Sequence, residues 1–166
     1  ETVNGPKQTV LSGDADGIDR VIAWAKEAGI RATKIPVSHA FHSSHMDPIL
    51  DAFEQTAATI DFQKPQHCQL ISNRYGDLLT DAPNATYWRE HIRNPVRFHE
   101  GIKTLFDKQT YVFIEIGPHP VLIGMSKRCH TGDVHPTWLP SAKKGSSDLD
   151  AFATSLGNLF LLGYPV

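Results

Sequence analysis

The chain has 166 residues, of which 40% are hydrophobic and 20% are charged, and its formal net charge is −2. This composition is typical of one globular domain with its own core, and the mixed charge argues against a nucleic-acid binder, which would carry a basic face. No stretch reaches the roughly 20 consecutive apolar residues of a membrane span, so no membrane partner is expected.

The first 37 residues predict a strand, a helix and a second strand. A short apolar run at 9–13 follows a turn, and Asp14 is a candidate N-cap for a helix that ends at Gly29. The alternating run at 30–37 predicts the second strand. A strand-helix-strand unit of this size corresponds to part of a ferredoxin-like fold.

The middle of the chain predicts three helices and a strand. Ser44 or Asp47 can cap the first helix, and the segment 68–73 reads as a strand that ends in a polar turn. Helices are expected at 85–92 and at 95–108, the latter with its proline at the first helical position. The first helix has an expected buried stripe of Ile49, Leu50, Phe53, Ala57 and Ile60.

The last third alternates strands and helices, which predicts an α/β fold. The run at 111–117 is apolar on both faces, as in a central parallel strand. A helix is expected at 121–129, a strand at 137–141 and an amphipathic helix at 148–163. The two cysteines of the chain form no CxxC pattern, which favours reduced thiols in a cytoplasmic protein.

Three histidines, His39, His42 and His45, recur at every third position after the run at 30–37. Three metal ligands must converge at about 2.0–2.1 Å from one ion, and this spacing brings them together only on a continuous helix. Pro36 and the extended residues around it indicate a loop instead, so no metal site is expected. His45 is interpreted as a solvated or capping side chain. A histidine among small residues just after a strand suits a general base, which must approach its nucleophile closely.

An ordered set of motifs resembles the acyltransferase domain of type I polyketide synthases, related to the malonyl transacylases of fatty-acid synthesis. The stretches are VNGPKQTVLSG, KIPVSHAFHSSHMDP, LISNRYGDLL, YWREHIRNPVRF, VFIEIGPHPVL and WLPS, followed by a helix that ends in LLGYPV. The resemblance implies three parts. Residues 1–37 would belong to a small ferredoxin-like subdomain, 38–140 would be the C-terminal part of an α/β-hydrolase-like large subdomain, and 141–166 would begin the linker that follows the acyltransferase.

The resemblance also implies the chemistry. A serine in a GHSxG turn takes the acyl group from acyl-CoA, and the last histidine of HAFH, here His42, is its general base. The acceptor is the phosphopantetheine thiol of an acyl carrier protein, and no bound cofactor is expected. The HAFH motif accompanies malonyl selectivity, so His39 and Phe41 are expected at the substrate, with Phe41 filling the space that an α-methyl group needs.

Two departures from the family pattern bear on activity. His91 stands where relatives carry an amide side chain that supports the catalytic histidine. We therefore expect His91 to support His42 through its backbone carbonyl. The sequence contains no GHSxG and no arginine at the position that binds the malonyl carboxylate. We therefore expect that the chain is the C-terminal part of the domain. It should be inactive alone and should depend on the N-terminal part for activity. Ketosynthase and linker would be its neighbours in a cytoplasmic synthase. The alternative is a non-catalytic docking or scaffold module for a carrier protein.

Overall fold

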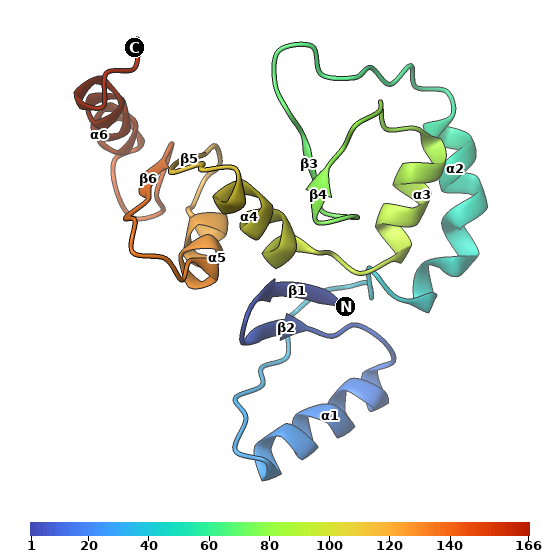
Figure 1. Cartoon of the computed structure of the whole chain (residues 1–166). Helices are drawn as coiled ribbons and strands as arrows, with labels where there is room; N and C mark the ends of the chain where they lie inside the picture. The colour runs from blue at the N-terminus through green and yellow to red at the C-terminus, as the bar shows by residue number, and fades with distance from the viewer. The chain divides into compact units, whose positions relative to one another are not determined.

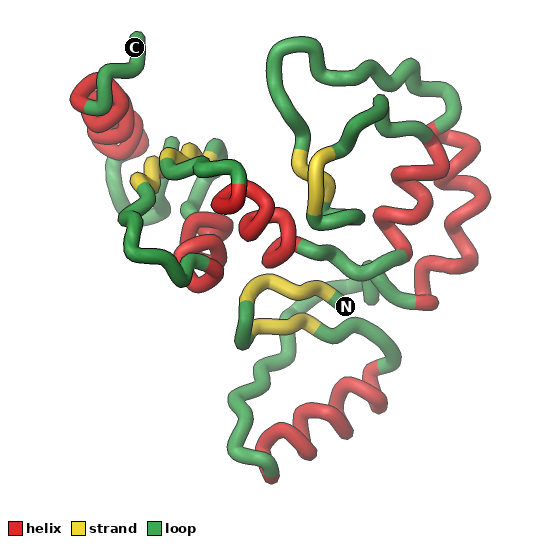
Figure 2. The backbone as a smooth tube through the Cα atoms, viewed as in Figure 1, coloured by secondary structure: helices red, strands yellow, loops and turns green.

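The computed structural model describes residues 1–166 and has an α/β fold in two compact units, Glu1–Gly101 and Ile102–Val166 (Figure 1). Short helices and strands alternate with long loops, as the tube in Figure 2 shows. None of the helices is long and apolar enough to span a lipid bilayer.

The first unit begins with an antiparallel hairpin of β1 (Thr2–Gly5) and β2 (Gln8–Val10), followed by helix α1 (Ala15–Glu27). The strand predicted at 30–37 is wrong: these residues form no ladder and all of them are exposed. A strand needs a partner for its backbone N–H and C=O groups, and no segment of the chain pairs with this one. The N-terminal arrangement is therefore strand-strand-helix rather than strand-helix-strand.

A short 3₁₀ helix, η1 (Ser44–Ile49), leads directly into α2 (Leu50–Ala57). Ser43 caps η1, because its hydroxyl accepts a hydrogen bond from the His45 N–H at 3.2 Å. The predicted buried stripe is only partly correct, since Leu50 and Ala57 are buried but Ile49 and Ile60 are 46% and 55% exposed.

Helix α3 (Ala85–Arg93) lies beside α2, and charged side chains join the two (Figure 1). Arg89 donates hydrogen bonds to Asp51 and Glu54 of α2. Before α3, a second antiparallel hairpin pairs β3 (Ile71–Ser72) with β4 (Asp77–Leu78). The buried Ser72 hydroxyl lies 2.9 Å from the Tyr87 hydroxyl and ties this hairpin to α3.

Helix α4 (Phe98–Asp107) begins three residues later than predicted. The prediction placed Pro95 in the first turn, but the residues that follow it have other partners. The Val96 carbonyl accepts from the Val3 N–H at 2.9 Å, and the Arg97 N–H donates to the Asn73 carbonyl at 2.7 Å. These bonds hold the segment extended, so the helix starts only after them.

The second unit contains the parallel pair of β5 (Val112–Glu115) and β6 (Thr137–Pro140) with helices α5 (Val121–Cys129) and α6 (Asp148–Leu161). All four elements were predicted, but β5 is shorter than the predicted 111–117. It also pairs only with β6, and Ile114 is 53% exposed, so in this chain β5 is not the central strand that its apolar run predicted. The Glu115 carboxylate at the end of β5 accepts the Leu122 and Ile123 N–H groups at 3.0 and 2.7 Å. It thereby satisfies two N–H groups that the first turn of α5 leaves free.

The boundary between the compact units, after Gly101, does not coincide with the predicted subdomain boundaries after residues 37 and 140. The compact units follow contacts within this chain. The predicted subdomains follow the resemblance to whole acyltransferases, and they stay predictions.

Candidate active site

His42 lies in the loop before η1 and has a left-handed backbone conformation, with φ of 60°. This region is unfavourable for a residue with a side chain and is held only where surrounding contacts impose it. Its N–H donates to the Ile92 carbonyl at 3.1 Å, and its own carbonyl accepts from the Ser12 hydroxyl at 3.3 Å. The backbone is thus fixed on both sides of the imidazole.

The imidazole of His42 is oriented by two backbone carbonyls. Its Nδ1 lies 3.0 Å from the carbonyl oxygen of His91 and 3.0 Å from that of Asn94. A carbonyl oxygen can only accept a hydrogen bond, so we assign the proton of the neutral ring to Nδ1. Nε2 then carries the free lone pair, as a general base requires.

Both carbonyls come from the C-terminal end of α3. The last carbonyls of a helix have no partner within it and form the negative end of its dipole. Proline disfavours helical geometry in the residue before it, and Asn94, which precedes Pro95, is extended at φ −91° and ψ 164°. The Asn94 carbonyl therefore leaves the helix direction and lies at His42 Nδ1.

The carbonyl of Asn94 was not predicted as part of the site. The sequence contained a usable signal, because an X-Pro pair at the end of an amphipathic helix predicts an extended residue there. The contact to Ile92 had no such signal, since any residue can supply a backbone carbonyl.

His91 contributes its backbone carbonyl to His42, so its replacement of the usual amide leaves this contact in place. Its ring packs edge-on to that of His42, with centroids 5.9 Å apart, and also contacts Tyr87 and Trp88. Burial lowers the pKa of the His91 imidazole, and positive charge on His42 and Arg74 lowers this pKa further. His91 is thus a neutral neighbour of His42 rather than a solvated surface residue.

The other residues of the motif have different surroundings. His39 Nδ1 lies 2.8 Å from the Ser38 hydroxyl, and its ring lies 5.9 Å from that of Phe41, which is 50% exposed. His45 pairs with Asp14 at 3.0 Å, at the start of α1. The three histidines of the cluster therefore have three separate sets of partners.

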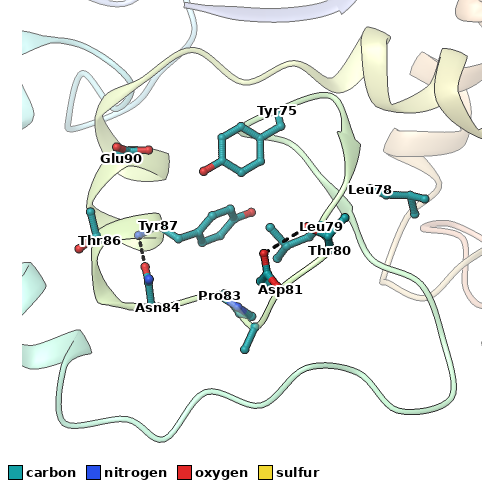
Figure 3. A pocket seen from close by; sticks show the side chains of 11 residues that line it. Tyr75, Leu78, Leu79, Thr80, Asp81, Pro83, Asn84, Thr86, Tyr87 and Glu90 are labelled. Carbon is teal, nitrogen blue, oxygen red and sulfur yellow. Dashed lines mark hydrogen bonds between the residues drawn. The ribbon is translucent and has the colours of Figure 1, made fainter.

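A cavity of about 320 Å³ lies elsewhere in the first unit, between the β4 loop and α3. Tyr75, Tyr87, Asp81 and Glu90 are among the side chains that line it (Figure 3). Its lining contains no histidine, so no imidazole base serves it. None of the three histidines of the cluster lines this cavity.

Comparison with known proteins gives one family. The model of the acyl transferase domain matches residues 1–166. The non-reducing polyketide synthase 1 of Elsinoe fawcettii is 35% identical over 97% of the chain, which spans 7% of that synthase.

Solved structures share the fold. The acyltransferase domain from the second module of the salinomycin polyketide synthase is 36% identical over 96% of this chain and 37% of that one, with a TM-score of 0.89. The malonyl CoA-acyl carrier protein transacylase of Clostridium perfringens is 28% identical, with a TM-score of 0.82, over 98% of this chain and 50% of that one. The chain therefore spans half or less of the length of these proteins.

Proposed function

The chain belongs to the acyl transferase domain family, and from this premise we propose that it supplies the general base of a malonyl transferase within a type I polyketide synthase. The donor would be malonyl-CoA, and the acceptor would be the phosphopantetheine thiol of an acyl carrier protein. The observation that carries the proposal is the orientation of His42, with Nδ1 on two carbonyls and Nε2 free.

In the first half-reaction a serine hydroxyl attacks the thioester carbonyl of malonyl-CoA while His42 Nε2 takes the hydroxyl proton. The tetrahedral intermediate expels CoA as a thiolate, which receives that proton from His42. In the second half-reaction His42 takes the proton of the phosphopantetheine thiol, the sulfur attacks the serine ester, and the proton returns to the serine oxygen. In each half-reaction His42 Nε2 holds the transferred proton for one step, while the carbonyls at the end of α3 keep the ring oriented.

The serine would come from the part of the domain outside this sequence, because the sequence contains no GHSxG. We propose the same origin for the arginine that binds the malonyl carboxylate, since guanidinium and carboxylate form a bidentate pair. Neighbouring synthase domains and a cytoplasmic location belong to this proposal too, supported by the similarity to polyketide synthase domains.

Substitution of the three histidines in the complete domain tests the assignment. His42→Ala should reduce both self-acylation and transfer by about 10²- to 10⁴-fold, the usual contribution of a positioned base. His39→Ala and His45→Ala should keep most of the rate, because neither ring shares the partners of His42. Loading of the carrier protein is followed by intact mass spectrometry.

Equal losses of rate on substitution of His39, His42 and His45 would contradict the assignment and favour a shared metal site. Elemental analysis for bound zinc would then test that site. Inactivity of the unmodified complete domain, with its serine turn present, would favour the docking function instead.

A further inference from the structure

The segment that carries His42 meets the end of α3 a second time, at Asp47. The Nε of Arg93, the last residue of α3, donates a hydrogen bond to Oδ1 of Asp47 in η1. The two side chains are 36% and 54% exposed. From the sequence, Asp47 is only a candidate helix cap, and no contact of Arg93 is predicted.

Arg93 lies within the backbone stretch that holds His42. On one side of it, the Ile92 carbonyl accepts from the His42 N–H, and on the other side the Asn94 carbonyl lies at His42 Nδ1. The ion pair and the hydrogen bonds of His42 therefore join the same two segments, 42–47 and 91–94. A movement of one segment against the other would stretch all of them together.

Within the 42–47 segment, Met46 is the buried apolar side chain, with 4% of its surface exposed. Phe41, just before His42, is half exposed. The left-handed backbone of His42, with φ of 60°, is disfavoured in isolation and needs contacts that impose it. A charge contact at the far end of the segment is well placed to supply part of this restraint.

We propose that Asp47 and Arg93 are positioning residues for His42, and that their ion pair keeps the 42–47 segment on the end of α3 with Nδ1 at its two carbonyl acceptors. The expected effect of the ion pair on catalysis rests on the proposed function, whereas its expected effect on the orientation of the His42 ring does not. Because exposed ion pairs contribute little to folding, the effect belongs to the orientation of His42 rather than to global stability.

The first test uses Arg93→Gln and Asp47→Asn in the complete acyltransferase domain. We expect kcat to fall by about 2- to 5-fold, the range that an exposed ion pair supports. KM should stay nearly constant, because neither side chain is placed at the substrate. High salt should shrink the difference from the unmodified domain, because it screens exposed charges. Arg93→Lys and the double exchange Asp47→Arg with Arg93→Asp should recover part of the lost rate.

Asp51→Asn provides a matched control. Asp51 of α2 makes a similar contact with Arg89 of α3, whereas Asp47 lies in η1. Arg89 also pairs with Glu54, and Arg89 is not adjacent in the chain to a residue whose carbonyl contacts His42. This variant removes a similar surface charge pair and should leave kcat unchanged. A kcat loss equal to that of Asp47→Asn would show that the two ion pairs act only on the packing of the η1 and α2 helices against α3, and it would overturn the proposal.

The second test observes the His42 ring directly. ¹⁵N chemical shifts of labelled histidine distinguish the two neutral tautomers, and the unmodified domain should show the proton on Nδ1. In Arg93→Gln the shifts should move toward a mixture of both tautomers, and in Asp51→Asn they should not. Unchanged shifts in both Arg93→Gln and Asp47→Asn would overturn the proposal even if activity fell. If the unmodified domain transfers no acyl group, the proposed function fails, and the tautomer comparison still decides the role of the ion pair.

Discussion

Phe41 is the side chain on which the expected malonyl preference depends. If its ring closes the pocket against an α-methyl group, His39→Tyr combined with Phe41→Ser should admit methylmalonyl-CoA to the complete domain. One methyl group in an apolar pocket is worth about 10- to 200-fold in selectivity, so the ratio should move within that range. Competition of the two thioesters for limiting carrier protein, read by intact mass, measures it.

The outcome that contradicts this role is an unchanged product ratio in a variant that still folds and acylates. Phe41→Ser alone is the informative control, because it removes the ring and keeps His39. The two rings lie 5.9 Å apart, so the effects of the two substitutions are not expected to be additive.

His91 makes the stability of the chain depend on pH. The folded state lowers the pKa of its imidazole below the ordinary 6.5, mainly through burial and then through charge on His42 and Arg74. The unfolded chain therefore binds more protons near that pH, and stability falls as the pH drops through about 6.5 and on to the lower folded-state pKa. His91→Gln cannot titrate, so its stability should fall less between pH 7 and pH 5, as measured by urea denaturation.

The exposed His67 offers the control for that comparison. His67→Gln removes one imidazole without touching His42 or its carbonyl partners. A pH profile that flattens equally in His67→Gln and His91→Gln would show that the surroundings of His91 have no special effect.

At the scale of single residues, motifs in the sequence predicted candidate site residues, whereas most of the contacts of these residues could not be predicted. HAFH led to His42, and the departure at His91 was recognised together with a backbone contact. The role of Asn94 and the contact of Arg93 with Asp47 depend on where two segments 46 to 52 positions apart meet in space. Local periodicity contains no information on such a meeting.

Among the turns, Gly76 and Gly29 form a natural matched pair. Both have left-handed backbones, with φ of 71° and 69°. A Cβ on Gly29 would meet nothing within 4 Å, whereas a Cβ on Gly76 would lie 2.5 Å from Cβ of Glu100. Gly29→Ala should therefore cost about 1–2 kcal/mol for the backbone alone.

Gly76→Ala should cost clearly more, because the β3–β4 turn must also move away from α4. The free energy of unfolding of the complete domain, from urea titrations, measures both changes. Equal costs would show that the turn and Glu100 separate without strain.

At the scale of elements, segments with internal signals were predicted and segments that need a distant partner were not. Helix α5 follows a clear turn and has its predicted bounds, and β5 and β6 are apolar enough to be recognised as strands, although β5 is three residues shorter than predicted and β6 is one residue shorter. The run at 30–37 alternates like a strand but finds no partner in this chain. Helix α4 starts late because Val96 and Arg97 bond to Val3 and Asn73, which no pattern within the helix reveals.

At the scale of the whole molecule, the chain leaves much apolar surface uncovered. Ile114 and Ile116 at the end of β5 are 53% and 89% exposed, and Phe160 and Leu161 at the end of α6 are 69% and 81% exposed. Large apolar side chains exposed to this extent suit a surface that another part of the protein covers. The related salinomycin domain is more than twice as long as the matched region, since this chain covers 37% of it.

We therefore expect the 166-residue chain alone to bind the dye ANS strongly and to load no carrier protein with a malonyl group. The complete domain, with its serine turn, should bind much less dye and should transfer the group. Dye fluorescence and intact mass spectrometry on matched samples measure the two properties separately. A complete domain in which only the serine is replaced by alanine should be inactive yet bind little dye, which separates the missing nucleophile from the uncovered surface. Robust loading by the chain alone would mean that it contains a nucleophile of its own, and the proposed division of roles between His42 and an external serine would be wrong.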